Sequence, residues 1–273
     1  MRKFAFPRIL PGAAALIITG VSLFGMSFAS SALAAAPVAA SAAGSHQIAL
    51  YHGKPRITNN GTASSTNWSG YAVTGATGAF TDVKATWVQP TATCSRRQTA
   101  YSSFWVGLDG YSSSSVEQLG TDSDCSRGKA TYYGWWEMYP NPSMELSTSS
   151  YPVSPGDTLT AEVHYTGSAY TLTMSSSRGW NFSTTQSGSF SRSSAEWIAE
   201  APSSCSITCS VLPLANFGTV NFSGSTANGA TIGSYGSSVW VDITMATSGG
   251  TVKAQPSALN GSGDGFSDTW HHS

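Results

Sequence analysis

Apolar and polar residues alternate with a period of two over much of the chain after about residue 67. Val83, Ala85 and Trp87, for example, fall on one face of an extended segment. Successive side chains of a β-strand point to opposite faces, so each such segment predicts a strand with one buried and one solvated side. The same alternation recurs in residues 159–165, 170–174 and 239–245.

Turn-forming residues separate these segments. The stretches 74–78 and 154–157 are rich in Gly, Ser, Thr, Asp and Pro, which favour turns. No segment of the body has a convincing helical period. Many short strands separated by turns indicate an all-β sandwich or barrel. A body of about 200 residues can bury roughly 70% of its unfolded surface, enough for one domain.

One predicted strand, residues 132–139, is unusually aromatic. Tyr133, Trp135, Glu137 and Tyr139 share one of its faces, so that aromatic rings surround a carboxylate. Such a face can line a cleft that holds an extended polymer. The alternative is a half-exposed amphipathic strand with no role in binding.

The two ends of the chain differ from the body. Basic residues at the start, an apolar run from 13 to 28 and Ala32-Leu33-Ala34 are typical of a secretory signal rather than a membrane anchor. We therefore expect a signal peptide at 1–34 and a pro-segment or disordered leader at 35–66. The folded domain is expected at 67–259, followed by a flexible Gly-rich tail at 260–273.

The body carries few charges, and most of them are negative. Charged residues make up 10% of the chain, against about 25% in an average protein. All 14 acidic residues follow residue 81, whereas only 8 of the 13 basic ones follow residue 66, which leaves a net charge of −6 there. This balance argues against nucleic-acid binding, which needs basic patches. The low charge suits an acidic medium, because ion pairs stop stabilising a fold once their carboxylates are protonated, and a fold with few ion pairs loses little. Ser/Thr-rich surfaces are, however, also common in ordinary secreted proteins.

The four cysteines predict disulfides, because an even number in a secreted chain usually pairs. Cys94–Cys125 and Cys205–Cys209 is the natural pairing, although three connectivities are possible. The alternative, a zinc site, has little support, since the histidines of the body are His164, His271 and His272. We expect no metal and no cofactor.

Exclusion narrows the possible chemistry. A Ser-His-Asp or Cys-His enzyme needs an embedded histidine, and His164 alternates out of an apolar face beside Glu162, which predicts a solvated side chain. A carboxylate can act as a general base and an amide can donate to an oxyanion, but the residues alone do not select a pair. The candidates are Asp109, Glu117, Gln118, Asp122, Glu137, Glu196 and Glu200.

Five motifs occur in a characteristic order along the body: Asn67-Trp68-Ser69-Gly70, the segment 104–110, Gln118-Leu119-Gly120, the segment 135–140 and the segment 195–200. Together they resemble the glutamic peptidase family (eqolisins), known from acid peptidases of filamentous fungi and from bacterial relatives. The resemblance extends from about Asn67 to about Met245. It implies a two-sheet antiparallel β-sandwich of the concanavalin-like or jelly-roll type, in agreement with the alternation.

The resemblance also implies roles for individual residues. Gln118 matches the family's catalytic glutamine, and Glu200 matches its catalytic glutamate, the second Glu of Glu-x-x-x-Glu. The chain departs from the family pattern in a segment before Gln118 that is one residue shorter, in Glu117, and in Ala201-Pro202 after Glu200. Residues expected to support the site or contact substrate are Trp68, Trp105, Asp109, Asp122, Trp135, Glu137, Tyr139 and Glu196.

These expectations describe a secreted, monomeric acid endopeptidase without a cofactor. Glu200 would activate a water and Gln118 would stabilise the oxyanion. Its partners would be protein or peptide substrates, with no nucleic acid and no membrane once the signal is removed. One alternative is a β-sandwich glycoside hydrolase that uses two carboxylates, such as Glu137 and Glu200. Another is a lectin-like module in which aromatic residues stack on sugars.

The leader suggests a further hypothesis. It contains no acidic residue but holds Lys54, Arg56, His46 and His52. These could dock it over the acidic site. Acid would protonate the carboxylates there and release an active enzyme.

Overall fold

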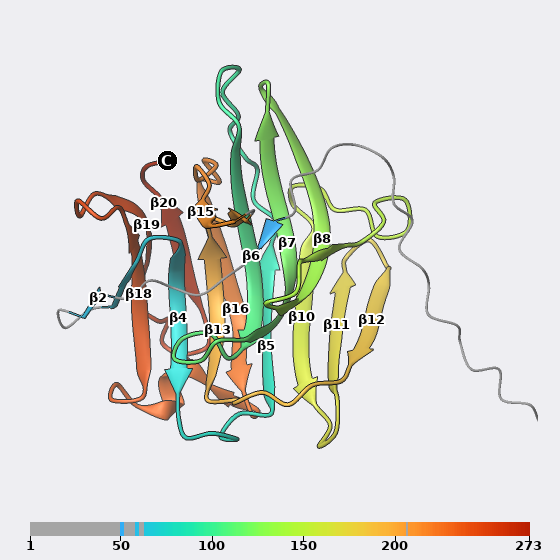
Figure 1. Cartoon of the computed structure of the whole chain (residues 1–273), viewed down its shortest axis with the longest axis vertical. Coiled ribbons are helices and arrows are strands. Elements are labelled where there is room, and N and C mark those ends of the chain that lie inside the picture. Colours follow the sequence, from blue (N-terminus) through green and yellow to red (C-terminus); the bar gives the residue numbers. More distant parts are fainter. Residues whose placement is uncertain (1–49, 52–57, 60–62, 206) are drawn as a thin grey trace, which may run out of the picture. The chain divides into compact units, whose positions relative to one another are not determined.

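A computed structural model gives the fold, and it describes residues 50–51, 58–59, 63–205 and 207–273 (Figure 1). Contacts divide the chain into two units, Met1–Val38 and Ala39–Ser273. The first unit, with the expected signal peptide at 1–34, lies outside the described residues, as does most of the expected leader at 35–66. The fold below is that of the second unit.

Nearly all regular structure is β, as the alternation predicted. Within the described ranges the one helix is η1 (Ile232–Tyr235), a single 3-10 turn, and no helix there has the length and hydropathy to cross a bilayer. The strands are β1 (Leu50–Tyr51), β2 (Thr58–Asn59), β3 (Ala63–Ser65), β4 (Trp68–Thr74), β5 (Asp82–Val88), β6 (Ala100–Leu108), β7 (Val116–Ser126), β8 (Lys129–Tyr139), β9 (Met144–Glu145), β10 (Thr158–Tyr165), β11 (Tyr170–Ser176), β12 (Asn181–Gln186), β13 (Ser194–Glu200), β14 (Ser203–Cys205), β15 (Cys209–Val211), β16 (Thr219–Ala227), β17 (Ala230–Thr231), β18 (Trp240–Ala246), β19 (Val252–Pro256) and β20 (Phe266–Trp270).

Hydrogen bonding joins most strands into one continuous, mainly antiparallel sheet (Figure 1). One half runs β12–β11–β10–β5–β16–β20, and the other runs β18–β4–β13–β6–β7–β8–β9. Strand β19 pairs with both β20 and β18 and so connects the halves. Because the apolar faces of the two halves pack against each other in one core, the folded sheet forms the two layers of a sandwich.

The main core lies between these layers. Val83 and Trp87 of β5 and Leu159 of β10 belong to the same cluster as Phe104 of β6 and Trp197 of β13, and all are fully or almost fully buried. The expected apolar face of 83–87 is therefore confirmed. The two-sheet antiparallel β-sandwich predicted from the alternation and the family resemblance is confirmed as well.

The second layer is also covered on its other face. On β13, Ala195, Trp197 and Ala199 point into the main core, and the residues between them point away from it. Trp68, Trp105, Trp135 and Ile198 form a separate buried cluster on that opposite face. The predicted catalytic residues lie on this face.

Both expected disulfides are present. Cys94–Cys125 ties the segment after β5 to β7, and Cys205–Cys209 closes the turn between β14 and β15. The described residues contain no free cysteine. The pairing favoured from the sequence is therefore confirmed.

Residues 260–273 differ from the flexible tail that the Gly-rich sequence suggested. Phe266–Trp270 form β20, which pairs with both β16 and β19, and Asp268 within it is fully buried. A five-residue strand between two long-range partners has too short an alternation to stand out. The expected start of the domain also shifts, because Ala63–Ser65 pair with β18 as β3.

The layering predicts that two valines on β5 contribute very differently to the free energy of unfolding. Val83 is fully buried, whereas Val88 is 45% exposed. Val83→Ala should lower the free energy of unfolding by about 2 kcal/mol, through lost burial and a residual cavity. Val88→Ala is the matched control and should change it by less than about 0.5 kcal/mol. Urea denaturation of both variants checks this, and equal effects would contradict the assigned faces.

Candidate active site

The register of five strands arranges the predicted site residues in rows across one face. Strands β4, β13, β6, β7 and β8 are neighbours in that order. Glu200 belongs to one row, Gln118 to another, and Trp105 lies in the row between them. The rows are Trp68–Glu200–Ser103–Asp122–Tyr133, Gly70–Ile198–Trp105–Gly120–Trp135 and Ala72–Glu196–Gly107–Gln118–Glu137.

Two glycines make room for the large side chains on this face. A Cβ at Gly120 would lie 2.2 Å from the carbonyl oxygen of Phe104 and 2.5 Å from Cβ of Trp105. A Cβ at Gly107 would lie 2.9 Å from the indole of Trp105 and 3.1 Å from Cβ of Gln118. Both glycines are therefore needed because Trp105 packs closely over its neighbouring strands.

Glu200 accepts hydrogen bonds on both carboxylate oxygens. The indole Nε1 of Trp105 donates to Oε2 at 2.8 Å, and Nδ2 of Asn67 donates to Oε1 at 3.3 Å. Asn67 is itself fixed by Ser65, whose hydroxyl donates to Oδ1 of Asn67 at 3.0 Å. Glu200 is fully buried, and hydrogen bonds donated to a carboxylate favour its ionised form.

Gln118 is held by a residue of the neighbouring strand β8. Its Nε2 donates to Oε2 of Glu137 at 3.1 Å, and the two residues are direct partners across β7 and β8. The structure thus brings Gln118 to Glu137, and Glu200 to Trp105 and Asn67. The two predicted catalytic residues share one face, with β6 and the indole of Trp105 between them.

Aromatic residues surround these groups, as the alternation of β8 indicated. The rings of Trp68 and Trp105 pack edge to face, with centroids 4.8 Å apart. Trp135 is fully buried in the same cluster, and Tyr139 packs against it half-buried. The four expected aromatic residues therefore lie on the face that carries Gln118 and Glu200.

Asp122 belongs to a hydrogen-bonded group at the Glu200 end. The hydroxyl of Ser103, the direct neighbour of Glu200 on β6, donates to Oδ1 of Asp122. The Tyr133 hydroxyl lies 3.1 Å from Oδ2 of Asp122 and 2.7 Å from Oδ2 of Asp124. Ser103 and Asn67 are site residues to which the sequence reasoning gave no role, although Asn67 opens one of the quoted motifs.

Asp109 has a structural role. It adopts a positive φ of 69° directly after β6. Its carboxylate accepts hydrogen bonds from the backbone N–H groups of Arg192 and Ser193 and from the Ser193 hydroxyl. Asp109 therefore fastens the segment that leads into β13, the strand that carries Glu200.

Glu196 and Glu117 are buried carboxyls with raised pKa values. Burial raises the pKa of Glu196 well above its usual value. Burial, and then the nearby charge of Asp109, raise the pKa of Glu117 to about 9. Glu117 alternates with Gln118, so its side chain lies on the side of the main core, which explains why it is not a site residue. Burial also raises the pKa of Asp268 to about 8.

Known proteins resemble this chain in sequence. The model of the Peptidase A4 family matches residues 66–263. Aspergillopepsin-2 of Aspergillus niger is 33% identical over 140 residues, which cover 48% of each protein. Scytalidopepsin B of Scytalidium lignicola is 34% identical over 161 residues, which cover 55% of this chain and 58% of the relative. The matched part thus spans about half the length of these two relatives.

Solved structures give a wider match. A crystal structure of scytalido-glutamic peptidase with a transition state analog inhibitor aligns with a TM-score of 0.64 and 26% identity, over 76% of this chain and 98% of that one. Aspergilloglutamic peptidase from Aspergillus niger aligns with a TM-score of 0.52 and 27% identity, over 63% and 99% of the two chains. These proteins are peptidases, so the comparisons do not favour the glycoside hydrolase or lectin-like alternatives.

The buried carboxyls predict that the fold is less stable at neutral pH than in acid. A group whose pKa is raised by folding stays protonated in acid, and its contribution is lost as pH rises from its unfolded to its folded value. For Glu117 this window runs from about pH 4 to about pH 9, and for Asp268 it runs from about pH 4 to about pH 8. The free energy of unfolding should therefore fall across it, by up to about 1.4 kcal/mol per pH unit for each group. Urea titrations at several pH values measure the slope.

Glu117→Gln provides the control for that measurement. It keeps the shape of the side chain but cannot ionise, so the slope should become shallower. Stability that rises toward neutral pH, or a slope unchanged in Glu117→Gln and in the matching Asp268→Asn, would contradict the assignment.

Proposed function

Because the chain belongs to the Peptidase A4 family, we propose that it is an acid endopeptidase with Glu200 as general base and Gln118 as oxyanion donor. The observation that carries this proposal is the environment of Glu200, whose two oxygens accept hydrogen bonds from Trp105 and Asn67 on the face that also carries Gln118. A base for an acid enzyme must remain ionised at low pH, and these donors favour that form.

The proposed first step uses water as the nucleophile. Glu200 takes a proton from a water whose oxygen attacks the carbonyl carbon of the scissile peptide bond. The carbonyl oxygen then becomes an oxyanion, which accepts a hydrogen bond from the Gln118 amide. Glu200 next delivers its proton to the amide nitrogen, and the carbon–nitrogen bond breaks. No covalent intermediate with the protein forms.

Glu137 positions the amide that serves the oxyanion. A side-chain amide has two N–H donors, so one group can hold Glu137 and also bind an oxyanion. The bond from Nε2 of Gln118 to Oε2 of Glu137 sets the plane of the amide. Glu137 is therefore a positioning residue in this proposal, whereas in a glycoside hydrolase it would be a proton donor.

The substrate is a protein or peptide in an extended conformation. Crystal structures of scytalido-glutamic peptidase hold a transition state analog inhibitor or a peptide based transition state analog. In this chain, the aromatic face of Trp68, Trp105, Trp135 and Tyr139 supplies flat apolar contacts of the kind that anchor a peptide. Secretion is part of the proposal, since both disulfides suit an oxidising compartment.

The leader is proposed to act as a pro-segment that covers the site. On one side of Lys54 and Arg56, β1 pairs with β14, which begins three residues after Glu200. On the other side, β2 pairs with β3, which ends two residues before Asn67. The described ends of this segment therefore pair with strands that lie next to Glu200 and Asn67 in the chain, whereas Lys54 and Arg56 themselves lie outside the described residues.

Replacing Glu200 should nearly abolish peptide hydrolysis. Glu200→Gln keeps the size of the side chain and removes the base, so activity on denatured casein at about pH 3 should fall roughly 10²–10⁴-fold. Clearance of casein by the parent protein should persist with a pepstatin-like inhibitor. Full activity in Glu200→Gln with an unchanged circular dichroism spectrum would refute the role of this residue.

Gln118 and Glu137 should differ in the size of their effects. Gln118→Ala removes the oxyanion donor and should lower kcat about 10²–10³-fold. Glu137→Gln should weaken the peptidase without abolishing it, whereas it would abolish a glycosidase. Gln255, an exposed residue of β19, gives the matched control Gln255→Ala, which should leave kcat unchanged. A Gln118→Ala enzyme as fast as this control would contradict the proposal.

The pro-segment proposal predicts pH-dependent binding. A peptide of residues 46–59 should bind the domain beginning at residue 63 more weakly at about pH 3 than at about pH 7, because acid neutralises the carboxylates. Fluorescence anisotropy measures both affinities, and a peptide with Lys54→Ala and Arg56→Ala is the control that should lose most of the pH effect. Equal binding at both pH values would rule this mechanism out.

A further inference from the structure

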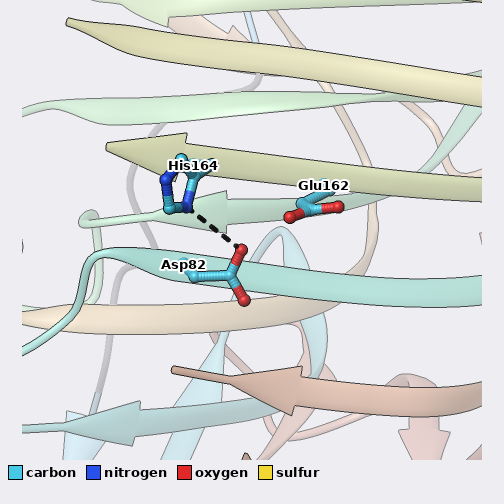
Figure 2. A group of neighbouring side chains, drawn as sticks. All are labelled: Asp82, Glu162 and His164. Carbon is cyan, nitrogen blue, oxygen red and sulfur yellow. Dashed lines mark ion pairs between the residues drawn. The ribbon is translucent and has the colours of Figure 1, made fainter. Parts of the chain in front are cut away.

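Three metal-ligating side chains meet on the face of β5 and β10 that points away from the core. Figure 2 shows Asp82 and His164 pointing toward each other from neighbouring strands, with Glu162 beside them. Asp82 and His164 are direct partners in the antiparallel register, and Glu162 is two residues from His164 on the same strand face. The strand pairing, and not a loop, therefore holds the group together.

The donor atoms are spaced as ligands of one small cation would be. One nitrogen of His164 and one carboxylate oxygen from each acid all lie within 4.8 Å of one another. Nδ1 of His164 is 3.6 Å from Oδ2 of Asp82. Two ligands of a tetrahedral zinc ion with bonds of about 2.1 Å are about 3.4 Å apart, so small rotations of these partly exposed side chains would complete the site.

The local charge also favours a cation. Asp82 and Glu162 are two carboxyl groups side by side, and Asp82 is only 18% exposed. The only basic groups within ion-pair distance of either acid are Lys84, whose Nζ is 3.5 Å from Oε2 of Glu162, and His164 itself, among the residues that the structure describes.

We propose that Asp82, Glu162 and His164 bind a divalent transition-metal ion of the Zn²⁺ type at neutral pH. One imidazole with two carboxylates suits Zn²⁺, and three protein ligands leave a position for water. Ca²⁺ is disfavoured because it takes six to eight oxygen ligands and no nitrogen. The small number of histidines predicted no metal from the sequence, because the register that places Asp82 opposite His164 cannot be predicted from the chain alone.

The site would stabilise the protein rather than take part in hydrolysis. Val83 and Val163, the neighbours of the ligands on each strand, point into the core, so the site and Glu200 lie on opposite outer faces of the sandwich. A bound ion would link β5 to β10 and raise the folded state's stability by mass action. Acid would release it, because protons compete for the ligands. The groups facing the ligands are Lys84 on β5 and Tyr235 in η1.

Calorimetric titration of the full chain with ZnCl₂ at neutral pH tests the proposal, after treatment with a chelator and with CaCl₂ as the comparison. One equivalent of Zn²⁺ should bind, and Ca²⁺ should not. His164→Gln should weaken Zn²⁺ binding at least tenfold. Lys84→Gln is the matched variant on the same face and should strengthen binding, because it removes the competing ammonium group.

The other histidines supply the decisive control. The chain has five, so a variant in which His46, His52, His271 and His272 are all Gln retains only His164. One-site binding in that variant supports the proposal. Absence of binding in the parent chain, or binding that survives His164→Gln and disappears with the other four, would overturn it. Asp82→Asn, checked for folding by circular dichroism, repeats the test with a second ligand.

Discussion

The hydrogen bond from the Trp105 indole to Glu200 is the interaction on which the proposed site depends. It places a donor against a fully buried carboxylate, where an ion without partners would be costly. Asn67, the residue before β4, adds a second donor. The geometry requires the pairing of β6 with β13 and the absence of a side chain at Gly107, since a Cβ there would lie 2.9 Å from the indole. Register, glycine placement and the aromatic residue thus form one structural unit.

Burial raises the pKa of other carboxyls in the same fold. Glu196 is four residues before Glu200 on the same strand face, yet burial raises its pKa well above the usual value. Glu117 is raised for the same first reason. Burial disfavours the charged form of a carboxyl, whereas N–H groups that donate to it, as those of Trp105 and Asn67 do to Glu200, favour that form. A protein with such groups is suited to acid, where they are neutral, and this agrees with the pH range proposed for its activity.

Alternation along the chain predicted the strands and the faces of β5, β8, β10 and β11, because each carries enough residues to establish a period of two. The family motifs pointed to Gln118 and Glu200 and to their aromatic surroundings. Contacts between strands distant in sequence could not be predicted. The opposition of Asp82 and His164, the role of Asn67 and the place of β20 all depend on register. Glu117 was one of the candidate catalytic carboxylates in the sequence, but its side chain lies on the core side of β7.

The pH–rate profile of a Trp105→Phe variant tests the central claim most directly. Phenylalanine keeps an aromatic ring in the cluster and removes the N–H donor, so Glu200 should accept a proton more readily. Measured on a peptide substrate, the acid limb of kcat/KM should move to higher pH, while activity above that limb changes much less. An acid limb at the parent position, with a uniform loss of rate, would show that the indole does not hold Glu200 in its ionised form.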